Sequence, residues 1–272
     1  MNNPSSYYFK TPSPHLDQEF DRLKYQAELS WDKEARNLSW FGLKDGMSIV
    51  ELGSGGGYIS EKLLNLCPHS LVSIVDISPV MLARSKTYLQ SQDKNKERVT
   101  FIEASVTDTG LPDNHFDLAY GRLIFQHLPD PVVAATEIFR ILKPGVKIVI
   151  TDIDDQLGWL SEPSISEVDF LLEKVKEMQG KLGGNRLIGR QLWSILKKTG
   201  FINLDLETIL SHSGEIDLEE MLIQFDFFVR YARAELTTEE IAIIEQARHK
   251  LVTDSNRFLG FLWFMAYGEK PI

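Results

Sequence analysis

The stretch Ser48–Leu63, SIVELGSGGGYISEKL, determines the class of fold. An apolar, strand-like run reaches the acidic residue Glu51, a turn of small residues follows, and then a helical pattern begins. A turn of this kind lets the backbone pass close to a ligand, and the first turn of the helix offers unpaired N–H groups. We therefore expect Gly53, Ser54 and Gly55 to form a ligand-binding turn.

The chain after this stretch alternates between short apolar runs and amphipathic segments. This alternation predicts a parallel sheet with helices on both faces, in which ligands bind beyond the carboxyl ends of the strands. The strand-like runs are 47–52, 70–77, 99–105, 116–123 and 146–153, and the helical segments are 57–66, 79–90 and 132–142. The residues at the strand ends are Glu51, Asp76, Ser105, Tyr120 and Asp152.

The flanking regions are mainly helical. Residues 14–41 carry an apolar stripe at helical spacing, and we expect an N-terminal helical segment, 1–44, to cover the site. The main domain is expected over 45–272, with helical lid elements at about 156–198 and 215–253. The patterns after Thr151 predict helices near 165–179, 191–198, 218–231 and 238–251, and strands near 201–210 and 258–268. The aromatic helix LIQFDFFVRYA is either ordinary core or a substrate lid.

Composition narrows the class of protein. The 272 residues are 43% apolar, which suits a folded chain of one large or two small domains. A net charge of −10 opposes binding to nucleic acid. No apolar run is long enough to cross a membrane, and no export signal is visible, so we expect a cytoplasmic protein. The single cysteine, Cys67, is expected to be buried and structural.

Asp76 is the second acidic residue of interest. It ends the second strand-like run, where a carboxylate can accept hydrogen bonds from both hydroxyls of a ribose. Its alternative role is to cap the helix at Pro79, although Ser78 is as well placed for that. An NAD-dependent oxidoreductase would also use such an aspartate, but the third glycine of G-x-G-x-x-G is replaced here by Tyr58.

Together these motifs resemble the class I S-adenosylmethionine-dependent methyltransferases. The resemblance covers about residues 47–152 and is carried by VELGSGGGY, VDISPVML, LPDNHFDLAY and LIFQHLPDPVVAATEIFRILKPGVKIVI. It implies a Rossmann-like α/β fold with a seven-stranded, mostly parallel sheet. It also implies S-adenosyl-L-methionine as cofactor and S-adenosyl-L-homocysteine as product. The segments DRLKYQ, GRLIFQHLPDP and FMAYGEKP resemble a branch of the family that acts on small molecules.

The resemblance also implies which residues hold the cofactor. Ser105 stands where many relatives have an aspartate for the adenine amino group, and a neutral hydroxyl should bind it more weakly. Near Arg22, Gln26 could close over the cofactor or stay exposed. The residues expected at the cofactor are Glu51, Gly53, Ser54, Gly55, Asp76, Ile77, Met81, Ser105, Val106, Tyr120, Gly121 and Gln26.

Catalysis requires little beyond alignment, because the sulfonium already activates the methyl group. A general base is optional, and the candidates are His127 and Asp154. His127 could equally be a buried structural residue. Arg122 and Asp152 are expected at the substrate, although Arg122 could instead pair with one of the aspartates beyond the fifth strand.

The acceptor is expected to be a small, partly apolar metabolite methylated on O, N or C, in secondary metabolism. The sequence AYGRL lacks the Asn/Asp-Pro-Pro-aromatic motif of adenine methyltransferases acting on nucleic acid. No metal is expected, because the histidines are scattered and no calcium loop is present. We expect a monomer or homodimer, and a non-catalytic protein that binds S-adenosylmethionine remains an alternative.

Overall fold

The computed structural model describes residues 6–7, 16–91, 97–253 and 257–272. Most of the first fifteen residues of the expected 1–44 segment therefore lie outside the described residues. The elements are α1 (Leu16–Glu28), α2 (Trp31–Trp40), β1 (Ser48–Leu52), α3 (Tyr58–Leu66), β2 (Leu71–Asp76), α4 (Pro79–Gln90), β3 (Val99–Glu103), β4 (Phe116–Arg122), α5 (Pro131–Ile141), β5 (Leu142–Ile153), α6 (Asp155–Gly158), β6 (Trp159–Glu162), α7 (Ser166–Lys181), α8 (Leu192–Lys198), β7 (Ile202–His212), α9 (Leu218–Ala232), α10 (Thr238–Thr253) and β8 (Phe258–Glu269).

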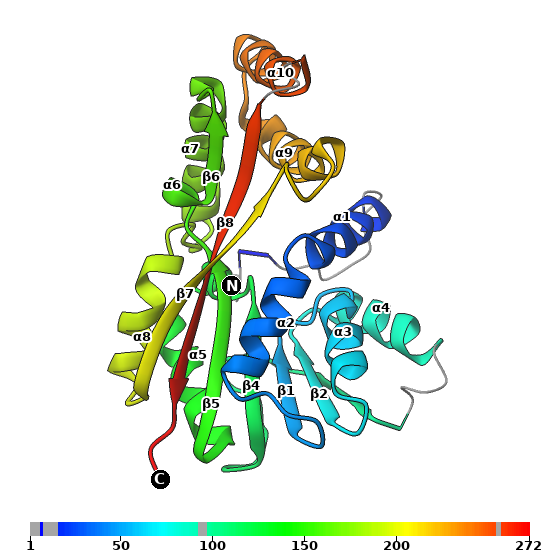
Figure 1. Cartoon of the computed structure of the whole chain (residues 1–272), viewed down its shortest axis with the longest axis vertical. Coiled ribbons are helices and arrows are strands. Elements are labelled where there is room, and N and C mark those ends of the chain that lie inside the picture. The colour runs from blue at the N-terminus through cyan, green and yellow to red at the C-terminus, as the bar shows by residue number, and fades with distance from the viewer. Residues whose placement is uncertain (1–5, 8–15, 92–96, 254–256) are drawn as a thin grey trace.

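One sheet organises the molecule (Figure 1). Its strand order is β3-β2-β1-β4-β5-β8-β6, and β7 pairs with the other edge of β8. Strands β3, β2, β1, β4 and β5 are parallel, whereas β8 runs antiparallel to β5, β6 and β7. The prediction of a mostly parallel sheet in a Rossmann-like α/β fold is confirmed. The sheet has eight strands rather than seven, because the short β6 pairs with the first half of β8.

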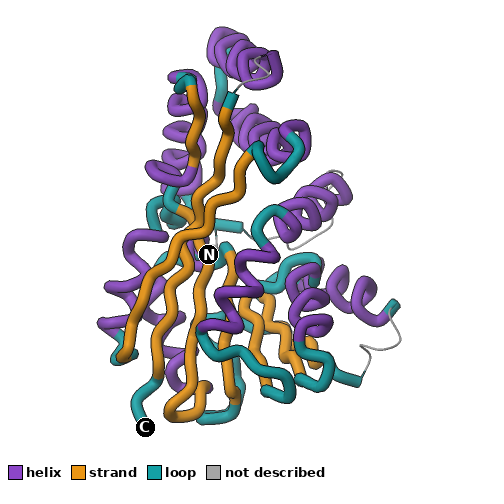
Figure 2. The backbone as a smooth tube through the Cα atoms, viewed as in Figure 1, coloured by secondary structure: helices purple, strands orange, loops and turns teal. Residues whose placement is uncertain are grey.

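Both faces of the sheet are buried, as the continuous apolar runs indicate. Successive side chains of a strand point to opposite faces, so Ile49 belongs to the core under α2 and α3 while Val50 belongs to the core under α5 and α8. Figure 2 shows the helices on either side of the strands. The last part of the expected lid element at 156–198 is not a lid. Helix α8 packs instead against this second face of the sheet through Leu192 and Leu196.

Local sequence signals set the helix starts. Pro79 opens α4, and Ser78 is its N-cap, with its hydroxyl accepting the Met81 N–H at 3.3 Å. Asp130 caps α5 before Pro131 in the same way. Because Ser78 supplies the cap of α4, the carboxylate of Asp76 is available for another role.

Three helices stand beyond the carboxyl ends of the parallel strands (Figure 1). We call α7, α9 and α10 the cap. The three helices contact one another, and α9 also contacts α1. The first half of β8 continues from the sheet toward them. Among the described residues, no helix is both long and apolar enough to cross a membrane.

Candidate functional site

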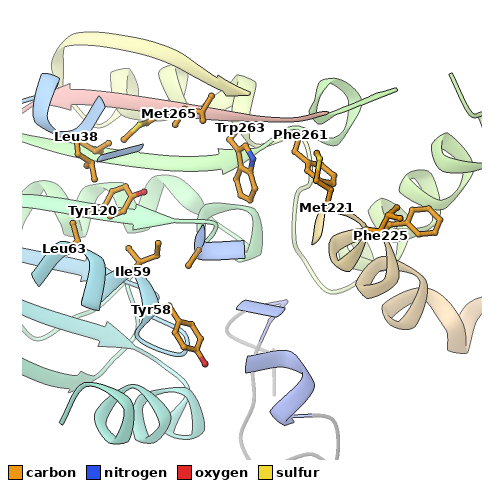
Figure 3. Packing of buried hydrophobic residues seen from close by; sticks show 14 of the residues in the cluster. Leu38, Tyr58, Ile59, Leu63, Tyr120, Met221, Phe225, Phe261, Trp263 and Met265 are labelled. Carbon is orange, nitrogen blue, oxygen red and sulfur yellow. The ribbon is translucent and has the colours of Figure 1, made fainter. Parts of the chain in front are cut away.

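A cavity lies between the sheet and the cap. Its walls come from the ends of β1, β2, β4 and β5, from α1, and from the cap and the first half of β8. Figure 3 shows Trp263 of β8 between the sheet residue Tyr120 and the cap residues Met221 and Phe225. The cavity thus joins the glycine turn to a chamber beneath the cap.

The glycine turn forms one end of this cavity. Gly53, Gly55 and Gly57 have φ angles of +69°, +53° and +82°, in the left-handed region that favours glycine. A Cβ on Gly57 would also lie 3.1 Å from the Cα of Ser85. These requirements explain the run of small residues after β1. Gly53, Ser54 and Gly55 all line the cavity, as the sequence predicts.

Asp76 lies beside this turn, where β2 ends. One carboxylate oxygen accepts the Gly55 N–H at 2.9 Å, and the other accepts the Ser78 N–H at 2.8 Å. Burial nevertheless raises the pKa of Asp76 to about 6. The side chain lines the cavity, so its remaining lone pairs face the space where a ribose could bind.

Glu51 is a second buried carboxyl group, at the end of β1. The Ser60 hydroxyl donates to it, and it lines the cavity. Burial raises the pKa of Glu51 to about 8, and the nearby Asp76 contributes in the same direction. Carboxyl groups at both strand ends suit a ligand that presents hydroxyl or amino groups better than a pyrophosphate.

The remaining predicted cofactor residues divide into two groups. Ile77, Met81, Ser105, Val106 and Gln26 line the cavity. Tyr120 and Gly121 do not appear among the lining residues. Tyr120 lies in the core, where its hydroxyl donates to Glu34 of α2. The sequence placed Tyr120 at the strand end, but its side chain points to the face of the sheet that α2 and α3 cover.

Arg122 lines the cavity, and its carboxylate partner is Glu34. Its Nε lies 3.0 Å from each carboxylate oxygen of Glu34, and its Nη2 donates to the Gln26 carbonyl at 2.7 Å. The guanidinium also lies over the Trp263 ring, 4.9 Å from its centroid. The alternative, a pairing with an aspartate beyond β5, is therefore wrong, and substrate binding by Arg122 stays a prediction. Arg122 ties α1 and α2 to the end of β4.

The aspartates beyond β5 have separate environments. Asp152 is buried and accepts the Gln126 N–H at 3.1 Å, and burial raises its pKa to about 7. Asp154 is buried in an ion pair with Arg190. Neither Asp152 nor Asp154 lines the cavity. The aspartate of this group that does is Asp155.

Asp155 is bound to Arg186, a residue that the sequence analysis missed. Arg186 donates from Nε and, at 3.0 Å, from Nη2 to the two oxygens of Asp155. Its Nη1 donates to Gln179 Oε1 at 3.0 Å, and its guanidinium lies 4.9 Å from the centroid of Phe228. The glycines before Arg186 are the one sequence feature of this stretch. They indicate a loop but do not show that the loop reaches the cavity.

His127 lines the cavity and is half-buried. Its Nδ1 lies 2.8 Å from the Ser6 hydroxyl and 3.3 Å from Gln179 Nε2. Because Arg186 donates to the oxygen of Gln179, the Gln179 nitrogen is the atom that faces His127. Burial and the charges of Arg186 and Arg22 lower the pKa of His127 to about 3. The ring is therefore neutral at pH 7, with its proton on Nε2.

Aromatic side chains line the chamber beneath the cap, and the sequence did not single out most of them. The α9 helix supplies Phe227, Phe228 and Tyr231, so the aromatic segment that could have been core also forms a cavity wall. Trp159 and Trp263 come from β6 and β8. Their shared strand pairing is a tertiary feature, so no local pattern indicates it.

No cluster of three or more potential metal ligands occurs within the described part of the chain. The expectation that no metal is required stays a prediction.

The sequence is similar to those of known methyltransferases. The family model described as "Methyltransferase domain" matches residues 50–150. Phosphoethanolamine N-methyltransferase 2 of Caenorhabditis elegans is 27% identical over 195 residues, which are 70% of this chain and 40% of that protein. The ubiquinone/menaquinone biosynthesis C-methyltransferase of Psychromonas ingrahamii is 25% identical over 187 residues, or 68% of each chain.

A solved structure has a similar fold. Phosphoethanolamine N-methyltransferase 2 of Haemonchus contortus, in complex with phosphomonomethylethanolamine and S-adenosylhomocysteine, superposes with a TM-score of 0.62 at 24% identity. The match covers 94% of this chain and 58% of that one. The chain belongs to the class I S-adenosylmethionine-dependent methyltransferases. The alternatives of an NAD-dependent oxidoreductase and of a non-catalytic binding protein gain no support from these relatives.

Proposed function

We propose that the protein transfers the methyl group of S-adenosylmethionine to an O, N or C atom of a small metabolite in secondary metabolism. The observation that carries this proposal is the continuity of one cavity from the glycine turn and Asp76 to the chamber beneath the cap. A cofactor at the first end and an acceptor at the second would lie in contact within it. The relatives named above act on a phosphorylated amine and on quinones, which supports a small acceptor without choosing its class.

The residues at the glycine turn fit the cofactor. Asp76 would accept hydrogen bonds from the ribose, and Glu51 would lie near the amino end of the methionine moiety. The close approach of the backbone at Gly53 and Gly55 would accommodate that moiety. Met81 and Val106 are buried apolar side chains at the same end, suited to the adenine ring.

The catalytic contribution of the chain is alignment and exclusion of water. When bound, the cofactor supplies a methyl group already activated by its sulfonium. The cap and α1 enclose the acceptor, and Arg122 and Arg186 fix the walls around it. A neutral His127 with its proton on Nε2 would orient an acceptor by donating a hydrogen bond, rather than remove a proton.

The first test is isothermal titration with S-adenosylmethionine and S-adenosylhomocysteine. The wild type should bind both, and Asp76→Ala should weaken binding at least about tenfold, because both ribose contacts are lost. Thr87→Ala, on the exposed side of α4 outside the cavity lining, is the control for folding. If the wild type binds neither compound, the proposal is wrong.

The finer predictions from the sequence belong to the same proposal. We expect a monomer or homodimer, a cytoplasmic location and no nucleic-acid partner. The net charge of −10 supports the last of these. Light scattering on the purified protein and fractionation of the cells that make it would test the first two.

A further inference from the structure

The cavity has cations, but each one already has an anionic partner. Among the described residues that line it, the cationic side chains are Arg22, Arg122 and Arg186. Arg122 pairs with Glu34, and Arg186 pairs with Asp155. Arg22 donates from Nε and Nη2 to Glu19, at 2.9 and 2.6 Å.

Most nitrogens of these guanidinium groups also donate hydrogen bonds to described residues; for Nη1 of Arg122 no such bond is seen. The third nitrogen of Arg22 donates to Gln224 Oε1 at 3.3 Å, and that of Arg186 donates to Gln179. Each guanidinium lies against an aromatic ring as well: Arg22 is 4.0 Å from the centroid of Phe227. A phosphate group is usually recognised by arginines whose donors are free to form paired hydrogen bonds. Among its described residues, the chamber offers no arginine without a carboxylate partner.

The surfaces that remain for an acceptor are aromatic. Phe227, Phe228 and Tyr231 face the cavity from α9, and Trp159 and Trp263 face it from the sheet side. Trp159 pairs in register with Phe261, and Phe261 and Trp263 share one face of β8 because they are two residues apart. The two indoles are therefore neighbours. Walls of this kind suit a flat ring.

Three donors in these walls lack partners. The indole Nε1 atoms of Trp159 and Trp263 and the amide Nε2 of Gln224 make no hydrogen bond to any described residue. All three residues line the cavity, and the two that are buried, Trp263 and Gln224, are each 4% exposed. An unpaired buried N–H is costly, and it is satisfied by an acceptor atom such as a carbonyl or ether oxygen. All three nitrogens are covered by neighbouring atoms, so pairing them with a ligand requires cap side chains to shift.

We propose that the methyl acceptor is an uncharged, flat ring compound whose oxygen atoms accept hydrogen bonds from Trp263 and Gln224. A phosphorylated amine is excluded, because its phosphate would be buried without a free cation. This inference rests on the proposed function, since it assigns the acceptor of that reaction.

The test uses three probes with the complex of the protein and S-adenosylhomocysteine. They are 2,3-dimethyl-1,4-naphthoquinone, 2,3-dimethylnaphthalene and phosphoethanolamine, and equilibrium dialysis measures the binding of each. The quinone and the hydrocarbon share one ring skeleton, so their difference isolates the two oxygens. We expect the quinone to bind at least about tenfold more tightly than the hydrocarbon, and phosphoethanolamine not to bind.

Trp263→Phe keeps an aromatic ring and removes the N–H. It should weaken quinone binding about threefold to tenfold and leave hydrocarbon binding unchanged. The matched control is Trp193→Phe, on α8 outside the cavity, which should change neither. An unchanged affinity for S-adenosylhomocysteine shows that the variant is folded.

The outcomes separate this inference from the proposed function. If S-adenosylhomocysteine does not bind at all, the proposed function fails and the inference falls with it. If S-adenosylhomocysteine binds but phosphoethanolamine binds better than the quinone, the inference alone is overturned. Equal loss of quinone and hydrocarbon affinity in Trp263→Phe also overturns it, because the indole would then act by shape and not by its N–H.

Discussion

His127 shows how the surroundings of one residue change its chemistry. A histidine near a sulfonium would ordinarily be considered as a general base. Here Gln179 donates toward Nδ1, and two arginines oppose protonation of the ring. The group that remains is an N–H donor.

We predict that His127 does not titrate between pH 5 and 8. Its pKa of about 3 should keep the ring neutral across this range, whereas an ordinary histidine changes charge near pH 6.5. NMR of the protein with labelled histidine measures this directly, and the His127→Gln variant assigns the resonance. A midpoint near 6.5 for that resonance would restore the general-base role.

At the scale of single residues, the sequence predicted those site residues whose position depends on the residues next to them in the chain. The glycine turn, Glu51 and Asp76 follow from strand ends and turn chemistry, and all reach the cavity. That Asp155 and not Asp154 lines the cavity was not predictable, because the chain turns into α6 at this point and no periodicity shows which side chain faces inward. The partner of Arg122 is Glu34, which lies 88 positions away in the chain, so the sequence could not indicate this ion pair either.

At the scale of elements, α1 is attached to both sides of the cavity. Arg22 and Gln26 both donate to Gln224 Oε1 of α9, at 3.3 and 3.4 Å. The Gln26 carbonyl accepts from Arg122 at the end of β4. Helix α1 thus connects the cap to the sheet, and Gln224 accepts its hydrogen bonds to the cap, beside the contact of Arg22 with Phe227.

We expect ligand binding to protect α1 and α9 together. Hydrogen exchange of residues 16–28 and 218–232 should slow when S-adenosylhomocysteine binds, because closing the cavity stabilises both helices. Gln224→Leu should abolish most of this slowing in α9 while α1 keeps it. Helix α8, which packs on the far face of the sheet, is the internal control. Equal protection of α9 in the variant and the wild type would show that Gln224 does not couple the helices.

The elements themselves were mostly predictable, because hydrophobic period and capping residues are local. Strand β6 was not, since four residues carry too little pattern and depend on β8 for pairing. Helix α8 was predicted as a helix but assigned to the lid, because sequence does not say which surface an amphipathic helix covers.

At the scale of the whole molecule, burial of carboxyl groups links stability to pH. Glu51, Asp76 and Asp152 have pKa values of about 8, 6 and 7, all above their ordinary values. Between its ordinary pKa of 4.5 and about 8, Glu51 keeps a proton in the folded state that the unfolded chain has lost. The folded state binds more protons, so its stability falls as the pH rises through this window.

We predict that the free energy of unfolding of the ligand-free protein decreases from pH 5 to pH 8. Each such group contributes a slope of up to about 1.4 kcal/mol per pH unit. Glu51→Gln should flatten the curve, because it removes one of these protons. Urea unfolding at several pH values measures it. A wild-type curve that rises over this range, or that coincides in slope with the variant, contradicts the burial argument.

Strand β8 also bears on how such a molecule can diversify. It pairs with β5 along Trp263–Glu269 and then continues to β6 and the cap. The glycine turn and its acidic partners come from residues 51–76, whereas the chamber walls come largely from residues after Gly158. The residues of the glycine turn and those of the chamber walls therefore lie in separate stretches of the chain, and β8 connects the two regions in the sheet. Changes in the second stretch can alter which compound is accepted while the first stretch is inherited intact.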